Sequence, residues 1–332
     1  MTNTTVLVAG GAGYVGSHTC MQLSEAGFLP VTFDNLTNGH REFVQWGPLE
    51  EGDIRDAQTV TEAFRKHRPI AVLHLAGLID VGESIRDPQS FYDNNVAGSV
   101  TLFGAALAAG IKSIVFSSTC ATYGSPEHMP IREHHPQHPI NPYGRTKLVA
   151  EQALADLDSY AAVRSVVLRY FNAAGADPLG RIGERHQPET HAIPLALQTA
   201  MGLRGSFSIF GEDYSTPDGT AIRDYVHVCD LARAHVLALQ YLLNGGRSES
   251  MNLGTGCGIS VRQLINAIEQ ETGFALNTVV SPRRDGDAPM LVADNAKAND
   301  ILGWSPRYNI RDIISSAYYW HQADADNSAP IA

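Results

Sequence analysis

Cysteine is scarce in this 332-residue sequence, and the four cysteines that it has are widely spaced. Cys20, Cys120, Cys229 and Cys257 form no C-x-x-C pair, so the sequence indicates neither a disulfide framework nor a zinc site. We expect all four to be small buried apolar side chains in a protein of a reducing compartment.

Long basic runs and long apolar runs are absent as well. Lys and Arg number 24 against 35 Asp and Glu, the formal net charge is −11, and the isoelectric point is near 5.6. A protein of this charge repels a nucleic-acid backbone. No stretch reaches the roughly 18 apolar residues of a membrane span, and no basic segment precedes the first apolar run. We therefore expect neither nucleic acid nor a membrane as a partner, and a cytoplasmic location.

The composition is that of a globular protein, with 44% hydrophobic and 18% charged residues. Short, nearly continuous apolar runs at 6–8, 31–33, 72–75, 114–116 and 166–168 alternate with helical segments. Such runs are typical of parallel strands that helices cover on both faces. The alternation predicts an α/β fold with a doubly wound parallel sheet.

Gly10, Gly13 and Gly16 form a G-x-x-G-x-x-G motif between the first predicted strand and a helix. Glycines there let the backbone turn tightly and approach a pyrophosphate at the positive end of the helix dipole. Asp34 ends the next strand, 18 residues after Gly16. A carboxylate there accepts hydrogen bonds from the adenosine ribose and repels a 2′-phosphate. The pattern therefore predicts NAD rather than NADP, on a Rossmann-type sheet.

A second group of functional residues follows a predicted helix start. Asn141 is a good N-cap and Pro142 a good first helical residue, so Tyr143 and Lys147 stand one turn apart on the same face of the helix. A phenol titrates near 10, and it needs nearby cations to act as a base at neutral pH. We expect Lys147 and an oxidised nicotinamide ring to supply them.

Hydroxyl side chains end the predicted strand at 114–116. Ser117, Ser118 and Thr119 lie at the carboxyl edge of the sheet, where ligands bind in this architecture. The Thr119 hydroxyl is placed to bridge a substrate alcohol and Tyr143. Without Tyr143, the simpler interpretation is that these hydroxyls satisfy backbone groups at a strand end.

The second half of the chain has a different composition. Residues 175–188 and 211–220 are rich in Gly, Pro, Asp and Ser and are expected to be substrate-facing loops. Helices then return, one over 230–243 and one that begins with a capping box of Ser260 and Gln263. We predict an NAD-binding domain at 1–173 with a return segment near 224–257, a smaller substrate-binding lobe at 174–322, and a flexible tail at 323–332.

Together these elements resemble the extended short-chain dehydrogenase/reductase family, and within it the UDP-glucose (UDP-galactose) 4-epimerases. The resemblance covers roughly residues 4–320. The other stretches that carry it are Gly52-Asp53-Ile54-Arg55, His74-Leu75-Ala76-Gly77, Val81-Gly82-Glu83-Ser84, Tyr92-Asp93-Asn94-Asn95-Val96, Arg169-Tyr170-Phe171-Asn172 and Arg223-Asp224-Tyr225-Val226-His227-Val228.

This resemblance implies a set of binding residues. For NAD, besides the glycines and Asp34, it implies Tyr14, Val15, Asn35, Asp53, Ile54, Leu75, Ala76, Gly77, Asn94, Ser117, Tyr143, Lys147 and Tyr170. For a UDP-sugar it implies Thr119, Asn172, His191, Phe210, Arg223, Arg284, Asp287 and Leu291. The two arginines agree with the physics, because an acidic protein that binds a dianion must supply local guanidinium groups. No metal is expected.

The reaction that the resemblance implies is reversible inversion at C4 of UDP-glucose and UDP-galactose. Tyr143, as a phenolate, takes the 4-hydroxyl proton while NAD oxidises C4, and the 4-keto sugar turns before it is reduced on its other face. Lys147 lowers the pKa of Tyr143 and holds the nicotinamide ribose. Thr119 assists Tyr143.

The resemblance also implies a homodimer, whose interface consists of a helix near 89–109 and the helix that begins at Pro142. Leu102, Ala105, Ala106 and Ala109 offer a small-residue face suited to close helix packing. The same face can instead pack on the sheet.

The chain departs from the family pattern at three places. Ile79, followed by Asp80, stands where many 4-epimerases have a Lys near the cofactor phosphates, so one phosphate contact is in doubt. Thr190-His191 replaces a common Asn pair before the substrate-lobe helix. Thr119 replaces the more usual Ser and keeps the hydroxyl.

Other functions stay open at this stage. Nucleotide-sugar 4,6-dehydratases share the first oxidation step but have Asp-Glu directly after the strand-end Thr, where this chain has Cys120 and Ala121. A non-catalytic NAD-binding protein of this fold would typically lack Tyr143 or Lys147. Leu291, at the position that closes the sugar pocket in the family, leaves UDP-pentoses and UDP-N-acetylhexosamines as alternative substrates.

Histidines gather at His134, His135 and His138. Pro136 and Pro139 interrupt any helix that could present them together, and no cysteine lies close in the sequence. We expect a solvated loop there rather than a metal site.

Overall fold

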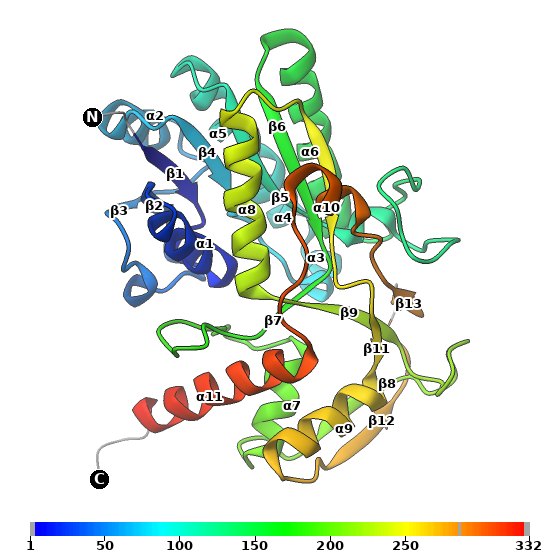
Figure 1. Ribbon diagram of the computed structural model, residues 1–332. Coiled ribbons are helices and arrows are strands. Elements are labelled where there is room, and N and C mark those ends of the chain that lie inside the picture. Colours follow the sequence, from blue (N-terminus) through cyan, green and yellow to red (C-terminus); the bar gives the residue numbers. More distant parts are fainter. Residues whose placement is uncertain (1–3, 285–286, 329–332) are drawn as a thin grey trace.

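The computed structural model describes residues 4–284 and 287–328 of the chain. Its largest element is a seven-stranded sheet with the order β10-β6-β5-β4-β1-β2-β3, in which every pair of neighbours is parallel (Figure 1). The strands are β1 (Thr5–Ala9), β2 (Leu29–Asp34), β3 (Leu49–Glu51), β4 (Ala71–His74), β5 (Ser113–Thr119), β6 (Arg164–Tyr170) and β10 (Glu249–Leu253). The doubly wound α/β fold is confirmed.

Helices cover both faces of this sheet. α1 (Tyr14–Glu25) and α8 (Val228–Leu243) pack on the face turned to the viewer in Figure 1, and α2 (Ala57–His67), α5 (Gly98–Ala108) and α6 (Pro142–Ala161) pack on the other. Both cores consist of buried apolar side chains, mostly aliphatic with a few aromatic rings, as the continuous apolar strands predict. Shorter helical segments are η1 (Arg41–Phe43), α3 (Val81–Arg86), α4 (Pro88–Phe91), the π-helical η2 (Tyr92–Ala97), η3 (Cys120–Tyr123) and α10 (Ala296–Leu302).

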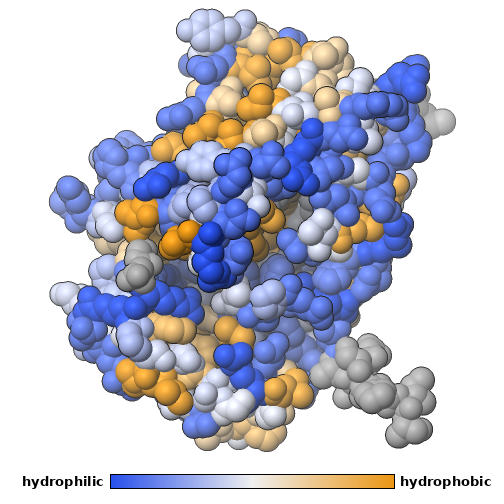
Figure 2. Space-filling model, turned by 180° about the vertical axis from the view of Figure 1, so that it is seen from behind, coloured by the Kyte–Doolittle hydropathy of each residue, from blue (hydrophilic) through white to orange (hydrophobic). Residues whose placement is uncertain are grey.

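A smaller lobe lies beyond the carboxyl edge of the large sheet, at the bottom of Figure 1. Its core is formed by α7 (Ala192–Ala200), α9 (Val261–Thr272) and α11 (Ile310–Ser328). One sheet joins β7 (Asn172–Ala174), β9 (Ile222–His227), β11 (Gly258–Ser260) and β13 (Met290–Leu291), and a second joins β8 (Phe207–Phe210) and β12 (Thr278–Ser281). From behind, Figure 2 shows a hollow between the two lobes.

Local signals set several of these boundaries. The Asp56 carboxylate caps α2 by accepting from the amides of Gln58 and Thr59, and Ser260 and Gln263 form the predicted capping box of α9. The return segment supplies α8 and β10, so the large sheet is completed by chain that follows the first part of the small lobe. No helix in the described part of the chain has the length and apolarity of a membrane span.

Three expectations need correction. Cys257 is exposed, whereas Cys20, Cys120 and Cys229 are buried as expected. The tail predicted to be flexible from 323 is helical as far as Ser328, because α11 continues to that residue; residues 329–332 lie outside the described part.

The third correction concerns the small-residue helix face. The predicted helix near 89–109 is divided into α4, η2 and α5. Leu102 and Ala106 are fully buried in the core beneath the sheet, and Ala105 packs against the same core. Leu102, Ala105 and Ala106 therefore pack on the sheet, the alternative that the sequence left open, whereas Ala109 is exposed.

Candidate active site

The glycine-rich turn connects β1 to α1. Gly10 has a φ of +82°, and a Cβ at Gly10 would lie 2.5 Å from the Ala76 amide nitrogen. A Cβ at Gly16 would lie 1.9 Å from the Gly10 carbonyl oxygen. Gly13 is the N-cap of α1, and no side chain caps this helix. The first amides of α1 are therefore presented to an anion, as the motif predicts.

Asp34 ends β2 beside this turn. Its carboxylate accepts hydrogen bonds from the Ala12 amide at 3.0 Å and the Leu36 amide at 2.9 Å. Burial raises the pKa of Asp34, and the two amide bonds oppose that rise. These bonds fix the carboxylate next to the glycine motif, where a ribose hydroxyl would donate to it.

Three of the residues that the resemblance implies for NAD, Asn35, Asp53 and Ile54, differ in exposure. Asn35 donates to Asp53 at 3.0 Å, and Arg55 pairs with the same carboxylate at 2.7 Å. These bonds, that of Arg55 foremost, hold the pKa of Asp53 well below its usual range. Ile54 is buried in the core against Gly98. Asp53 and Asn35 are accordingly the polar side chains in this part of the predicted NAD site.

Leu75, Ala76 and Gly77 follow β4 and form the next wall of the site. A Cβ at Gly77 would lie 3.1 Å from the Lys147 ammonium nitrogen. This segment is held by Asn95 of η2, whose side chain accepts from the Leu78 amide and donates to the Leu78 carbonyl. A side chain at position 77 would therefore crowd the Lys147 ammonium, which would have to move by a few tenths of an ångström.

Asn95 also donates to the Thr146 hydroxyl and accepts from Asn94, so it joins η2, the β4 loop and α6. In the sequence, Asn95 is only one member of the stretch Tyr92-Asp93-Asn94-Asn95-Val96, and no pattern there predicts this role. The signal available was an amide side chain next to Asn94, which was assigned to the cofactor.

Tyr143 and Lys147 stand together at the start of α6. The Asn141 side chain accepts from the Gly144 amide at 2.8 Å, and Pro142 is the first helical residue, as predicted. Tyr143 is 9% and Lys147 4% exposed. The Lys147 ammonium donates to the Ser117 carbonyl at 3.0 Å and lies 5.0 Å from the centre of the Phe116 ring. The strand-end hydroxyl segment and the start of α6 thus share one site.

Burial controls the protonation of this pair. It raises the pKa of Tyr143, a shift that Tyr170 reinforces and the neighbouring Thr119 hydroxyl partly offsets. Burial also lowers the pKa of Lys147 to about 8, and Glu151 opposes that shift. Desolvation of the phenolate is therefore the dominant influence on the pKa of Tyr143 in this geometry.

A buried ion pair stabilises the segments that form the site. Arg169 on β6 and Glu151 on α6 meet at 2.6 Å, with each side chain 6% exposed. Ser118 donates to Glu151, and the Arg169 guanidinium donates to the Tyr123 hydroxyl at 2.9 Å. This network ties α6 to β5, β6 and η3. The sequence does not predict the partner of Arg169, because no local pattern links it to Glu151, 18 positions earlier.

The predicted nucleotide anchors lie on the small lobe. The Arg284 guanidinium stacks on the Phe210 ring, 3.8 Å from its centre. Arg223 pairs with Asp287 and lies beside Leu291 in the parallel register of β9 and β13. Two guanidinium groups, an aromatic ring and the Leu291 side chain are thereby brought together on the small lobe. Two other residues of this stretch, Asp285 and Gly286, lie outside the described part.

Other predicted residues have contacts of their own. Asn172 begins β7, and Tyr170 ends β6. The Tyr14 hydroxyl donates to the Gly175 carbonyl at 2.5 Å, so Tyr14 joins the glycine-rich helix to the loop after β7. Val15 is half-buried against two apolar cores. His191 points its Nδ1 to Glu184, 2.5 Å away.

At the first departure from the family pattern, Ile79 is 44% exposed and Asp80 caps α3 by accepting from the Glu83 amide at 2.6 Å. The loop with His134, His135 and His138 is largely exposed, as predicted.

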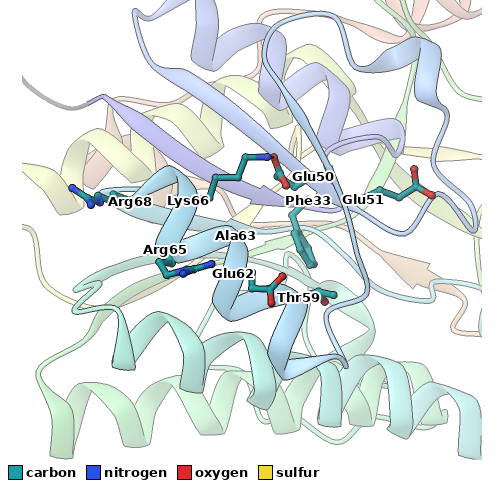
Figure 3. Close-up of a pocket in the computed structure, with 9 residues that line it drawn as sticks. All are labelled: Phe33, Glu50, Glu51, Thr59, Glu62, Ala63, Arg65, Lys66 and Arg68. Atoms are coloured by element: carbon teal, nitrogen blue, oxygen red, sulfur yellow. Dashed lines mark hydrogen bonds and ion pairs between the residues drawn. The ribbon is translucent and has the colours of Figure 1, made fainter.

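A separate surface hollow lies at the edge of the large sheet. Figure 3 shows it between β3 and α2, with Lys66 reaching to Glu50 and the Phe33 ring at its back. None of the predicted site residues lines it.

Residues 6–254 match the family model described as the NAD dependent epimerase/dehydratase family. The chain belongs to this family. It is 61% identical over 321 residues to a UDP-glucose 4-epimerase of Rhizobium leguminosarum bv. trifolii, covering 97% of this chain and 98% of that relative.

Solved structures agree with this membership. A UDP-glucose 4-epimerase of Brucella ovis in complex with NAD is 48% identical with a TM-score of 0.93, covering 96% of this chain and 98% of that one. A UDP-glucose 4-epimerase of Stenotrophomonas maltophila with bound NAD and formylated UDP-arabinopyranose is 41% identical with a TM-score of 0.95, covering 98% of this chain and 100% of that one.

Proposed function

We propose that this protein interconverts UDP-glucose and UDP-galactose by reversible inversion at C4, with NAD as a resident cofactor. The observation that carries the proposal is the buried pair of Tyr143 and Lys147 at the carboxyl edge of the large sheet, between the glycine-rich turn and the small lobe. Relatives that share almost the whole chain are UDP-glucose 4-epimerases.

The residues present fit NAD. The uncapped N-terminus of α1 offers amides to a diphosphate, and the open space around Gly13 leaves room for its approach. Asp34 is held where the adenosine ribose would donate to it. When bound, NAD supplies the reversible two-electron oxidation of C4.

Tyr143 acts as the proton acceptor and donor at the 4-hydroxyl. Because its free pKa is raised by burial, it becomes an effective base only when positive charge enters the site. The Thr119 hydroxyl forms a hydrogen bond with the Tyr143 hydroxyl and so orients the phenol. The Lys147 ammonium is held by its bond to the Ser117 carbonyl. The low exposure of both side chains keeps bulk water from the keto intermediate.

Arg223 and Arg284 hold the diphosphate while the sugar turns. The guanidinium of Arg284 is oriented by stacking on Phe210, and that of Arg223 is held by Asp287. Anchoring the nucleotide and leaving the hexose free allows C4 to present either face to the same acceptor.

Dehydration at C5 and C6 is disfavoured by the residues after Thr119. Burial raises the pKa of the Cys120 thiol to about 12, and Ala121 carries no functional group. Neither residue can protonate a leaving hydroxyl at neutral pH, and this argues against the 4,6-dehydratase alternative.

We infer a homodimer that uses other residues than the predicted small-residue face. Val81, Ile85, Tyr92 and Val100 are 38–52% exposed on α3, η2 and α5, and we infer that these exposed apolar side chains contribute to the interface. Light scattering should give twice the mass of 35.8 kDa, and Ile85→Asp should give the monomer mass.

We also infer a cytoplasmic location, because none of the four cysteines, all of them in the described part, forms a disulfide.

The function is tested by following UDP-galactose by NMR with the purified protein and saturating NAD. Appearance of UDP-glucose up to a fixed equilibrium ratio is expected. Unchanged substrate would refute hexose epimerisation, and a 4-keto-6-deoxy product would identify a dehydratase. Parallel reactions with UDP-N-acetylglucosamine and UDP-xylose decide between the sugar classes.

A further inference from the structure

Four metal-binding side chains lie together in the loop between β7 and α7. Glu184, His186, Glu189 and His191 each offer one ligand atom, and these atoms lie within 4.8 Å of one another. The spacing E-x-H-x-x-E-x-H places all four in eight residues. In Figure 1 this segment belongs to the green loop above α11.

The two carboxylates of the cluster are buried, the His186 and His191 side chains are 18% and 39% exposed, and the cluster is incompletely bonded. The Glu184 side chain is 4% and the Glu189 side chain 7% exposed. Glu184 Oε1 and the Nδ1 atoms of His186 and His191 are shielded from solvent, yet have no partner in hydrogen-bond geometry among the described residues. Buried polar atoms without partners are rare and call for an explanation.

The separations lie on both sides of those around a small cation. His186 Nδ1 lies 3.3 Å from Glu184 Oε1 and 3.8 Å from Glu189 Oε2, and His191 Nδ1 lies 2.5 Å from Glu184 Oε1 and 3.5 Å from Glu189 Oε1. Ligand atoms around tetrahedral zinc, with bonds of about 2.0 to 2.2 Å, are roughly 3.3 to 3.5 Å apart. To hold one ion, His191 and Glu184 would therefore have to separate by about 1 Å, and the other pairs need smaller adjustments.

We propose that this cluster is a structural binding site for a divalent transition metal, with zinc as its natural occupant. Two carboxylates and two neutral imidazoles together carry two negative charges, which a divalent cation neutralises. A set of nitrogen and oxygen ligand atoms without a thiolate suits zinc. All four tetrahedral positions are filled by the chain. A site without an open position is structural rather than catalytic.

Surrounding contacts explain what such a site would stabilise. Trp320 of α11 donates from its indole nitrogen to the Glu184 carbonyl at 2.9 Å, and the Tyr14 ring stands edge-on to His186. His191 is the N-cap of α7. Metal binding would therefore order the loop that contacts the glycine-rich helix, the C-terminal helix and the first helix of the small lobe.

The competing interpretation is a closed ion-pair network of two imidazolium rings with two carboxylates. Burial opposes their charge, but Glu184 and Glu189 raise the pKa of His186 to about 9 and that of His191 to about 10. Such a network needs no metal, and it predicts that added zinc leaves the protein unchanged.

The test uses the untagged full-length protein. After equilibration with zinc and gel filtration, we expect about one zinc per chain by mass spectrometry of the metal. A chelator should remove it and lower the melting temperature by about 5 °C, the shift expected when a ligand is present at about 100 times its dissociation constant. Cobalt should replace zinc and give the visible absorption bands of a four-coordinate site.

His186→Ala and Glu189→Gln should each lower the zinc content at least tenfold and abolish the chelator effect. His138→Ala, which removes an exposed histidine of another loop, should change neither. Wild-type protein with less than a tenth of an equivalent of zinc and no melting shift would overturn the proposal, whether or not the variants fold. So would full zinc retention by His186→Ala. These readouts do not involve epimerisation, so the proposal stands or falls separately from the proposed function.

Discussion

Replacing Tyr143 by Phe separates chemistry from binding and stability. The ring packs edge-on to Phe91, with centres 6.5 Å apart, and phenylalanine keeps that contact. Only the hydroxyl is removed, and the Thr119 hydroxyl retains its bond from the Ala121 amide. The loss of unfolding free energy should therefore be about 0.5 to 1.5 kcal/mol, the net value of one hydrogen bond.

Turnover should fall much further, by about 10²- to 10⁴-fold, because a positioned general base contributes that much. At 1.36 kcal/mol per decade this is about 3 to 5 kcal/mol of activation free energy. The assay is single-substrate epimerisation of UDP-galactose, with UDP affinity measured by calorimetry and stability by urea unfolding. UDP affinity should remain within a few-fold of wild type.

The matched control is Tyr241→Phe, which removes a hydroxyl that accepts from the Arg247 amide at the far end of α8. It should leave turnover within a factor of two. The reasoning is refuted if Tyr143→Phe retains more than a tenth of wild-type turnover, because the base would then lie elsewhere. It is equally refuted if both variants lose activity in proportion to stability.

Three further predictions follow from the same site. Burial lowers the pKa of Lys147 in the folded protein to about 8 from 10.5, so between these pH values the unfolded chain binds one more proton than the folded protein. The stability of the wild type relative to Lys147→Met should therefore rise by on the order of 3 kcal/mol as the pH increases from 8 to 10.5. Urea unfolding of both proteins measures this difference, and a difference that stays constant with pH contradicts the prediction. Glu151→Gln leaves the Arg169 guanidinium buried without its counter-ion and should cost about 3 to 5 kcal/mol in chemical unfolding, whereas a loss below 1 kcal/mol would mean that the pair is solvated. Leu291→Tyr should suppress turnover of UDP-N-acetylglucosamine at least tenfold and spare the hexoses, since one buried group is worth about 1 to 3 kcal/mol of discrimination; equal kcat/KM values for both proteins would show that Leu291 is not the gate.

The sequence predicted the fold well where periodicity and caps are local. Apolar runs gave five strands of the large sheet, and Asp56, Asn141 and Ser260 marked helix starts that the structure contains. Glycine spacing placed the turn beside Asp34, because strand, turn and helix are consecutive in the chain. These signals need no knowledge of distant contacts.

Prediction failed where the answer depends on distant partners. Nothing near Leu102 says whether its helix face meets the sheet or another chain, and both interpretations require an apolar side chain. The Glu151 and Arg169 pair joins a helix to a neighbouring strand, and Asn95 joins three segments. The protonation of Tyr143 likewise depends on how deeply it is buried, which its spacing from Lys147 does not reveal.

The late return of β10 to the large sheet has a consequence for synthesis on the ribosome. β10 pairs along β6, with Leu253 opposite Tyr170, so β6 remains an uncovered edge until another 83 residues have been added. At about 5 to 20 residues per second, the nascent chain exposes that apolar edge for roughly 4 to 17 seconds. An exposed edge strand is a template for pairing between chains. Expression fragments that end before residue 254 would keep this edge open permanently, so aggregation of such fragments would report the missing strand rather than a fault in the cofactor-binding half.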